Sequence, residues 1–179
     1  MENEILELTY SSSKFGEDLS IIHCWEEIST INIVTEDETL VGTANFNFYN
    51  TLDYENWLDV VFVADGDSDD DYFVLETLEN NLDEDEILGY NIVLLKTIEI
   101  KPSYQYKGIG TMAMREFLNY WSYLGAEIST LEPAPLNSSL KGVKRKNCIE
   151  KLVSFYSKLD FEEIWDEKEQ EPYLYKFLD

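Results

Sequence analysis

The sequence predicts an α/β fold in a single domain, on three observations. Residues 91–100 form an apolar run rich in β-branched side chains, as expected for a buried strand. Apolar residues then recur at helical spacing over 114–124, and Gly125 follows as a helix-ending residue. Residues 40–49 alternate apolar and polar side chains, which indicates one strand of a hairpin. The chain of 179 residues has no internal repeat and no Pro/Ser-rich linker, so we expect one domain over residues 1–179.

The remaining elements follow from the same patterns, in chain order. In the first half we expect a short strand or arm at 1–13, strands at 21–25, 31–34 and 57–64, and a turn at 35–39. After the strand at 57–64, Ser68 or Asp69 is expected to cap a helix. Residues 65–89 are therefore expected to form an acidic helical elaboration. In the second half we expect a strand at 127–131, a helix at 146–159 and a closing hairpin of 162–165 with 173–177.

An acidic stretch at residues 65–76 comes close to the calcium loop of an EF-hand, with Glu76 at the twelfth position. The obligatory turn glycine is Asp70 here, and the preceding run reads as a strand rather than a helix. Acidic residues at a helix N-terminus explain the pattern with fewer assumptions. We therefore expect no metal site.

A glycine motif, Gln105-x-x-Gly108-x-Gly110, connects the apolar strand to the helix that follows it. Pro102 ends the strand, because proline cannot donate to a sheet ladder. A glycine loop at a helix N-terminus presents unpaired N–H groups and the positive end of the helix dipole, which together bind phosphate. The alternative is a βα turn that needs glycine for its shape alone.

A second motif covers residues 155–161, Phe-Tyr-Ser-Lys-Leu-Asp-Phe. Together with the glycine loop it resembles the signatures of the GNAT superfamily of acyl-CoA N-acyltransferases. The family has glycine where this chain has Asp160, at a helix end where a left-handed residue is common, and Asp tolerates that conformation better than most residues. The resemblance covers residues 91–165 well and the first half only by strand order.

The resemblance implies a mixed, mostly antiparallel central sheet with helices on both faces and a splay at the cofactor strand. It implies an N-acetyltransferase that uses acetyl-CoA as acyl donor and a primary amine as acceptor. The implied cofactor-binding residues are the backbone of Ile98, Glu99 and Ile100 along the pantetheine arm, and Gln105, Tyr106, Lys107, Gly108, Ile109, Gly110 and Thr111 around the pyrophosphate.

Two residues are candidates for catalysis. In many family members the tyrosine that corresponds to Tyr156 protonates the departing thiolate, although its helix face also fits a core tyrosine. Glu99 is the only acid on the cofactor strand and is our candidate general base, and Glu132 is a similar one. On the register set by Gln105, some relatives carry a Glu at the position of Leu94.

The charge of the chain is unevenly distributed. Residues 1–90 hold 24 Asp and Glu against one cation, Lys14, whereas residues 91–179 hold 13 acids and 12 cations. An acidic surface attracts cationic acceptors such as a polyamine, an aminoglycoside or a Lys-rich protein segment, or else it serves solubility. It excludes direct binding to nucleic acid or an anionic membrane, both of which need basic patches. The basic run, which could meet the cofactor's phosphates, comprises Lys141, Lys144, Arg145, Lys146 and Lys151.

The remaining features set the compartment and the rival function. Cys24 and Cys148 form neither a disulfide framework nor a zinc motif, and the acidic N-terminus lacks signal-peptide character, so we expect a cytoplasmic protein with no membrane span. His23 is the only histidine, which excludes a His-based metal cluster.

The rival hypothesis is a non-catalytic acidic interaction protein on the same scaffold, binding a basic partner. The oligomeric state is open, a dimer being one option.

Overall fold

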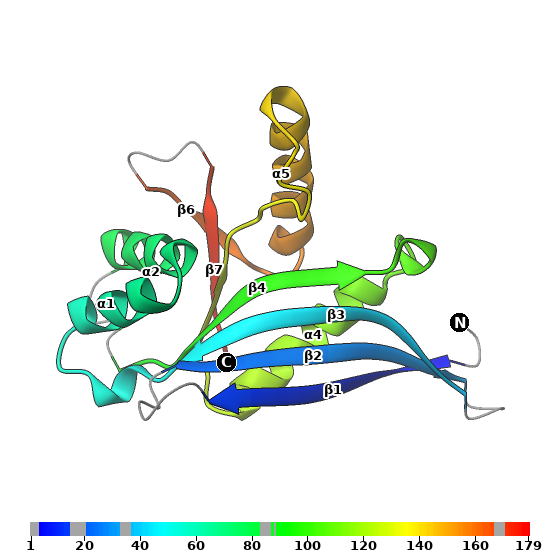
Figure 1. The fold of residues 1–179 in the computed structure, drawn as a ribbon, viewed down its shortest axis with the longest axis horizontal. Helices are drawn as coiled ribbons and strands as arrows, with labels where there is room; N and C mark the ends of the chain where they lie inside the picture. Colours follow the sequence, from blue (N-terminus) through cyan, green and yellow to red (C-terminus); the bar gives the residue numbers. More distant parts are fainter. Residues whose placement is uncertain (1–3, 15–20, 33–36, 83–86, 88, 167–170) are drawn as a thin grey trace.

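The computed structural model describes residues 4–14, 21–32, 37–82, 87, 89–166 and 171–179. Its strands form one seven-stranded sheet in the order β1-β2-β3-β4-β5-β7-β6 (Figure 1). All neighbouring strands are antiparallel except β4 and β5, which are parallel. The strands are β1 (Glu4–Lys14), β2 (Ile21–Asn32), β3 (Glu38–Tyr49), β4 (Ile92–Ile100), β5 (Ile128–Leu131), β6 (Glu162–Ile164) and β7 (Tyr173–Phe177).

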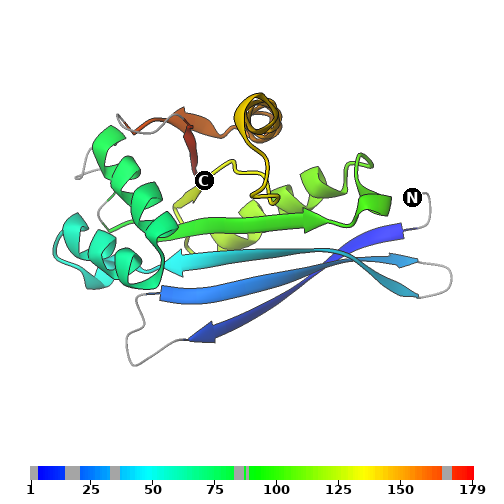
Figure 2. The same cartoon turned by 45° about the horizontal axis from the view of Figure 1, so that its top comes forward.

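Helices cover both faces of the sheet, because successive residues at the start of β4 pack into different cores. Ile92 and Leu94 pack with α1 and α2 on one face, whereas Val93 and Leu95 pack with α4 on the other (Figures 1 and 2). The predicted fold class is therefore confirmed. The helices are α1 (Trp57–Asp67), α2 (Asp69–Asn81), α4 (Ile109–Tyr123) and α5 (Gly142–Ser157), with short 3-10 turns η1 (Thr51–Asp53) and η2 (Pro102–Tyr104). Among the described helices, none is long and apolar enough to cross a membrane.

The prediction of a strand at 57–64 is wrong, because this segment is helix α1. The Asn56 side chain caps the helix by accepting a hydrogen bond from the Asp59 backbone N–H at 3.1 Å. The buried side chains recur at helical spacing: Trp57, Val60, Val61 and Ala64. A short, continuous apolar run fits a buried strand and a buried helix equally well, so periodicity alone misassigned it.

The two strands predicted at 21–25 and 31–34 form one strand, β2, over the residues that the structure describes. The pair Glu26 and Glu27 does not interrupt it, and Glu26 points into the core. Val34 and the start of the predicted turn at 35–39 lie outside the described residues, and Glu38 and Thr39 belong to β3.

The other predicted elements are confirmed, with some shifted ends. These are β1, β3, α2, β4, α4, β5 and the hairpin of β6 with β7, while α5 begins four residues before the predicted helix and ends two residues earlier. Gly125 ends α4 in the left-handed conformation, with the paired backbone hydrogen bonds from Gly125 and Ala126 that are typical of this kind of helix end.

Glu26 is a carboxyl group buried between the sheet and α4. It is 1% exposed, and its Oε1 has no hydrogen-bond partner among the described residues. Burial raises its pKa to about 7, and Tyr10, its cross-strand neighbour on β1, offsets only part of this shift. Below about pH 7 the folded protein therefore favours the protonated, uncharged form of Glu26.

We expect Glu26→Gln to stabilise the protein at high pH. The folded pKa of about 7 exceeds the ordinary value of 4.5, so this group's contribution to the free energy of unfolding is fully present below pH 4.5 and is lost as pH rises through 7. The advantage of the variant over the parent should grow from near zero at pH 4.5 to about 3 kcal/mol at pH 8. Urea denaturation across this range measures it.

The matched control is Glu27→Gln, which alters the exposed neighbour on the other face of β2. It should show no comparable growth with pH. An advantage of Glu26→Gln that stays constant from pH 4.5 to pH 8 would contradict a titrating core carboxyl.

Candidate active site

The site begins where β4 and β5 separate. The two strands pair only between Ile92–Leu95 and Ile128–Leu131, and β5 then ends. The second half of β4 continues to Ile100 while pairing with β3 on its other side. Among the described strands, none pairs with the β5 side of residues 96–100, and this is the splay that the family resemblance implies at this strand.

A β-bulge at Lys96 marks the start of the splay. Leu95 pairs with Phe46 and Thr97 pairs with Asn45, so Lys96 is the extra residue on β4. The inserted residue reverses which positions face α4: Leu95 does so before the bulge, and Ile98 and Ile100 do so after it. Lys96 itself faces α2, where its amine contacts Ser68 Oγ at 3.2 Å.

The glycine loop follows directly after β4 and η2. The Gln105 side chain donates to the Ile100 carbonyl at 2.8 Å, which ties the loop to its own strand. Tyr106 (φ 61°) and Gly108 (φ 82°) are both left-handed, and the Lys107 amine lies 5.2 Å from the centre of the Tyr104 ring. This double reversal turns the chain into the first residue of α4, and η2 and the loop together span residues 102–108.

The start of α4 offers an anion-binding arrangement. Met112 N–H is the first to bond back to Gly108, so the three preceding N–H groups of the helix have no intrahelical partner, and no described side chain caps them. The left-handed backbone at position 108 favours glycine. The backbone at position 110 is not left-handed, and a Cβ there would make only ordinary contacts with Ile100 and Phe155, at 3.8 and 3.9 Å. The chain itself therefore gives no steric reason for glycine at 110, whereas a ligand lying on the loop would.

A cavity of about 210 Å³ opens at the splay, on the α2 side of the sheet. Its wall includes Leu94, the position at which the family resemblance places a glutamate in some relatives. The charged groups come from three elements: Asp70 on α2, Lys96 on β4, and Glu132 just after β5. The other lining residues are Val74, Leu95, Thr97, Ala134, Pro135 and Leu136.

Glu132 is the carboxylate best placed for proton transfer in this cavity. Burial raises its pKa above the ordinary value, the nearby Asp70 carboxylate adds to the shift, and Arg145 offsets part of it. The Arg145 guanidinium lies 3.6 Å from Glu132 and makes a closer, bidentate contact with Glu171, at 2.6 and 2.7 Å. Arg145 is thus paired with carboxylates, although from the sequence it was expected among the cations that could bind the phosphates of the cofactor.

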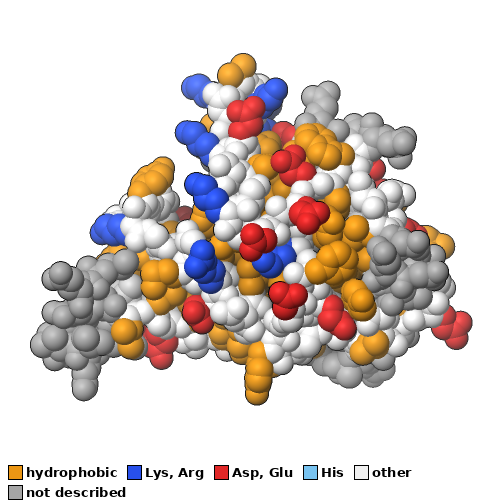
Figure 3. Space-filling model, turned by 180° about the vertical axis from the view of Figure 1, so that it is seen from behind, with side chains coloured by type: hydrophobic (Ala, Val, Ile, Leu, Met, Phe, Trp, Pro, Cys, Tyr) orange, Lys and Arg blue, Asp and Glu red, His pale blue; other side chains and the backbone are white. Residues whose placement is uncertain are grey.

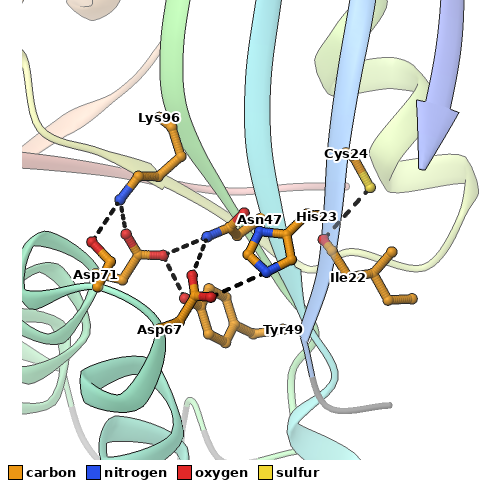
Figure 4. A network of polar contacts seen from close by, with 9 residues as sticks. Ile22, His23, Cys24, Asn47, Tyr49, Asp67, Asp71 and Lys96 are labelled. Atoms are coloured by element: carbon orange, nitrogen blue, oxygen red, sulfur yellow. Dashed lines mark hydrogen bonds and ion pairs between the residues drawn. The ribbon is translucent and has the colours of Figure 1, made fainter. Parts of the chain in front are cut away.

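A buried polar network lies beside the cavity (Figure 4). The carboxylate of Asp71, 0% exposed, accepts hydrogen bonds from Lys96 and Tyr49, and from Asn47 at 2.7 Å. It joins α2 to two strands of the sheet, because Tyr49 and Asn47 lie on β3.

The network continues to the surface through Asp67 and His23. Asn47 also donates to Asp67 at 3.1 Å, and Asp67 contacts His23 Nε2 at 3.1 Å (Figure 4). Burial lowers the pKa of Lys96, and the nearby carboxylates, Asp70 first, partly oppose that shift. This network was not predicted from the sequence. The one signal for it is Lys96, the only charged residue among the first seven of the apolar strand run.

The two predicted catalytic residues lie in different surroundings. Tyr156 lies on α5 and is 5% exposed, pointing into the core with the rings of Phe155 and Phe161 beside it. Burial raises its pKa, which keeps the hydroxyl protonated. Glu99 is exposed on the face opposite Ile98 and Ile100, as alternation predicted, but it does not line the cavity. Whether either residue takes part in catalysis stays a prediction.

Two further expectations concern charge and metal. The exposed lysines Lys141, Lys144, Lys146 and Lys151 lie at the start of α5 and along it, and Figure 3 shows Lys and Arg side chains gathered in that part of the surface.

Residues 65–76 belong to α1 and α2 rather than to a calcium loop. Within the described part of the chain, no three His, Cys, Asp or Glu side chains converge on a metal position. Asp160, the departure from the second motif, is left-handed (φ 64°), as expected.

No family model and no curated protein matches the chain. Solved structures are similar to it. Arabidopsis thaliana NAA60 in complex with a bisubstrate analogue is 12% identical, covering 89% of this chain and 77% of that chain with a TM-score of 0.46. A GNAT-family acetyltransferase from Staphylococcus aureus Mu50 is 13% identical over 88% and 68%, with a TM-score of 0.44. A mutant AtaT toxin bound to the C-terminus of the antitoxin AtaR is 13% identical over 96% and 92%, with a TM-score of 0.46. At these values the likeness says nothing about activity.

We expect Lys96→Met to destabilise the protein by about 3 kcal/mol, because it leaves the buried Asp71 carboxylate without its cation. The double variant Lys96→Met/Asp71→Asn should recover part of this loss, since the neutral amide needs no counter-charge. Urea denaturation of the single and double variants measures the coupling. Lys144→Met, which alters an exposed lysine on α5, should change stability by less than about 0.5 kcal/mol. Strictly additive losses at residues 96 and 71 would contradict the pairing.

Proposed function

We propose that this protein is an N-acyltransferase of the GNAT type that transfers an acetyl group from acetyl-CoA to a primary amine. The observation that carries the proposal is the continuity of the splayed end of β4, the left-handed glycine loop and the uncapped start of α4. These three features follow one another within residues 96–111 and present backbone donors along one path. A bound thioester would supply an activated acyl group at the cavity end of this path.

The loop residues fit a pyrophosphate. The free N–H groups at the start of α4 supply donors, and the absence of a side chain at Gly110 leaves room for close approach. Nearby, Ile98, Glu99 and Ile100 have backbone groups without a β5 partner, which could pair with an extended arm as another strand would. The exposed lysines of α5 add positive charge in a chain whose first half is almost entirely acidic.

Proton transfer has one candidate at each stage. The attacking amine must lose its proton, and Glu132 in the cavity is the proposed base because its raised pKa brings it nearer the working range. The departing thiolate must gain a proton, and Tyr156 is the proposed acid because its hydroxyl stays protonated. Glu99, the base predicted from the sequence, is set aside in favour of Glu132 because it does not line the cavity.

Gly110→Glu tests the cofactor site. The added carboxylate would occupy the position of the pyrophosphate and repel it, so acetyl-CoA binding measured by calorimetry should fall at least about 100-fold. Gly110 is a sharper test than Gly108, since its backbone tolerates a side chain without strain. Gly66→Glu is the matched control, because it places the same charge in open space at the end of α1. Tight binding by the Gly110 variant would refute the loop assignment.

Glu132→Gln tests the base. We expect a fall in kcat of about 100-fold or more, with the affinity for acetyl-CoA largely retained. In the parent protein kcat/KM should decline as pH falls through the pKa of Glu132, which burial holds above 4.5, because the protonated carboxyl cannot accept a proton. The variant should lose this acidic limb of the pH profile. An unchanged limb would assign the titration to another group.

A further inference from the structure

The charges around the cavity point to the class of acceptor. We propose that the acceptor is a short aliphatic polyamine, in which the reacting primary amine carries a second ammonium group a few carbons away. The inference rests on the proposed acyl transfer and adds to it the chemistry that the cavity recognises.

Two carboxylates line the cavity, and the only cation contact of Glu132 among the described residues is the long one of 3.6 Å to Arg145, which binds Glu171 more closely. Asp70 comes from α2 and Glu132 from the segment after β5, so they stand on different walls. They are close enough for the Asp70 carboxylate to act on the protonation of Glu132. An acceptor that spans the two walls would place one nitrogen at Glu132, for reaction, and the other at Asp70.

The two cations at the cavity make their closest contacts with acids that do not line it. The Lys96 amine contacts the buried Asp71, and the Arg145 guanidinium is bidentate to Glu171. Neither cation is therefore free to receive the carboxylate or phosphate of an anionic acceptor. Among the described residues around the cavity and its network, five carboxylates lie near two permanent cations, Lys96 and Arg145, and one histidine, His23, which contacts Asp67. The carboxylates are Asp67, Asp70, Asp71, Glu132 and Glu171. A cationic guest is favoured by this balance.

Much of the remaining cavity lining is apolar. Its apolar residues are Val74, Leu94, Leu95, Ala134, Pro135 and Leu136, which suits a methylene chain. The volume of about 210 Å³ is below the roughly 300–1,000 Å³ of pockets that hold drug-sized ligands, so the guest is short and narrow. These dimensions disfavour an aminoglycoside.

The field of the wider surface acts in the same direction. The helices α1 and α2, which bring Asp70 to the cavity, lie in the half of the chain with 24 acids and a single lysine. Such a surface concentrates cations near its clefts and raises their association rate, with a strong dependence on salt.

The test compares three amines of equal chain length as acceptors, with acetyl-CoA as donor: cadaverine, n-pentylamine and δ-aminovalerate. They carry an ammonium, a methyl or a carboxylate at the far end. We expect kcat/KM to be at least about tenfold higher for cadaverine than for n-pentylamine, and lowest for δ-aminovalerate. Added salt should shrink the preference for cadaverine.

Asp70→Asn identifies the residue responsible. The ratio of kcat/KM for cadaverine to that for n-pentylamine should fall to about threefold or less, because the neutral amide no longer pairs with the second ammonium group. Asp69→Asn is the matched control: it removes the same charge one residue earlier on α2, where the side chain is exposed and does not line the cavity. This variant should keep the parent's preference.

The outcomes separate this inference from the proposed function. Equal use of cadaverine and n-pentylamine, or an undiminished preference in Asp70→Asn, would overturn the polyamine assignment while leaving acyl transfer intact. Acetyl-CoA binding without acetylation of any of the three amines would overturn it as well. Failure of the proposed function has a different signature, namely no acetyl-CoA binding by the folded parent protein in calorimetry.

Discussion

The arrangement of the candidate site depends on the buried ion pair between Lys96 and Asp71. Lys96 is the extra residue of the β4 bulge, and Asp71 is fully buried on α2, so the pair holds the helix against the strand at the point where the splay begins. A carboxylate in such a position is costly unless donors surround it, and Tyr49 and Asn47 supply the remaining ones. The cavity wall made by α2 is thereby fixed relative to β4.

Two parts of the molecule differ in charge. On the α2 side of the splay, carboxylates outnumber cations around the cavity, whereas exposed lysines follow α5. A donor that is a polyanion and an acceptor that is a cation would be attracted to different regions of one surface. The glycine loop and the cavity lie at the two ends of the unpaired stretch of β4.

The β-bulge and the burial of the cavity also explain why Glu132 is better placed than Glu99 to act as a general base. After the bulge, alternate side chains of β4 point to opposite faces, so Glu99 points away from α4. Glu99 lies further along the strand than the residues that line the cavity. Glu132, which follows the short strand β5, reaches the cavity because that strand ends where the splay opens. Desolvation there shifts the pKa of Glu132 toward the range that a general base needs.

Features that depend on local backbone chemistry could be predicted from the sequence. These include β4, the glycine loop, α4 with its Gly125 end, and the left-handed Asp160. The helical state of residues 57–64 depends on tertiary packing, because the apolar run from Trp57 suits a strand or a helix and contact with α2 selects the helix. The bulge at Lys96 and the pairing with Asp71 were likewise beyond the sequence. Register depends on hydrogen bonds to β3, and the two charges meet only when segments 25 residues apart pack together.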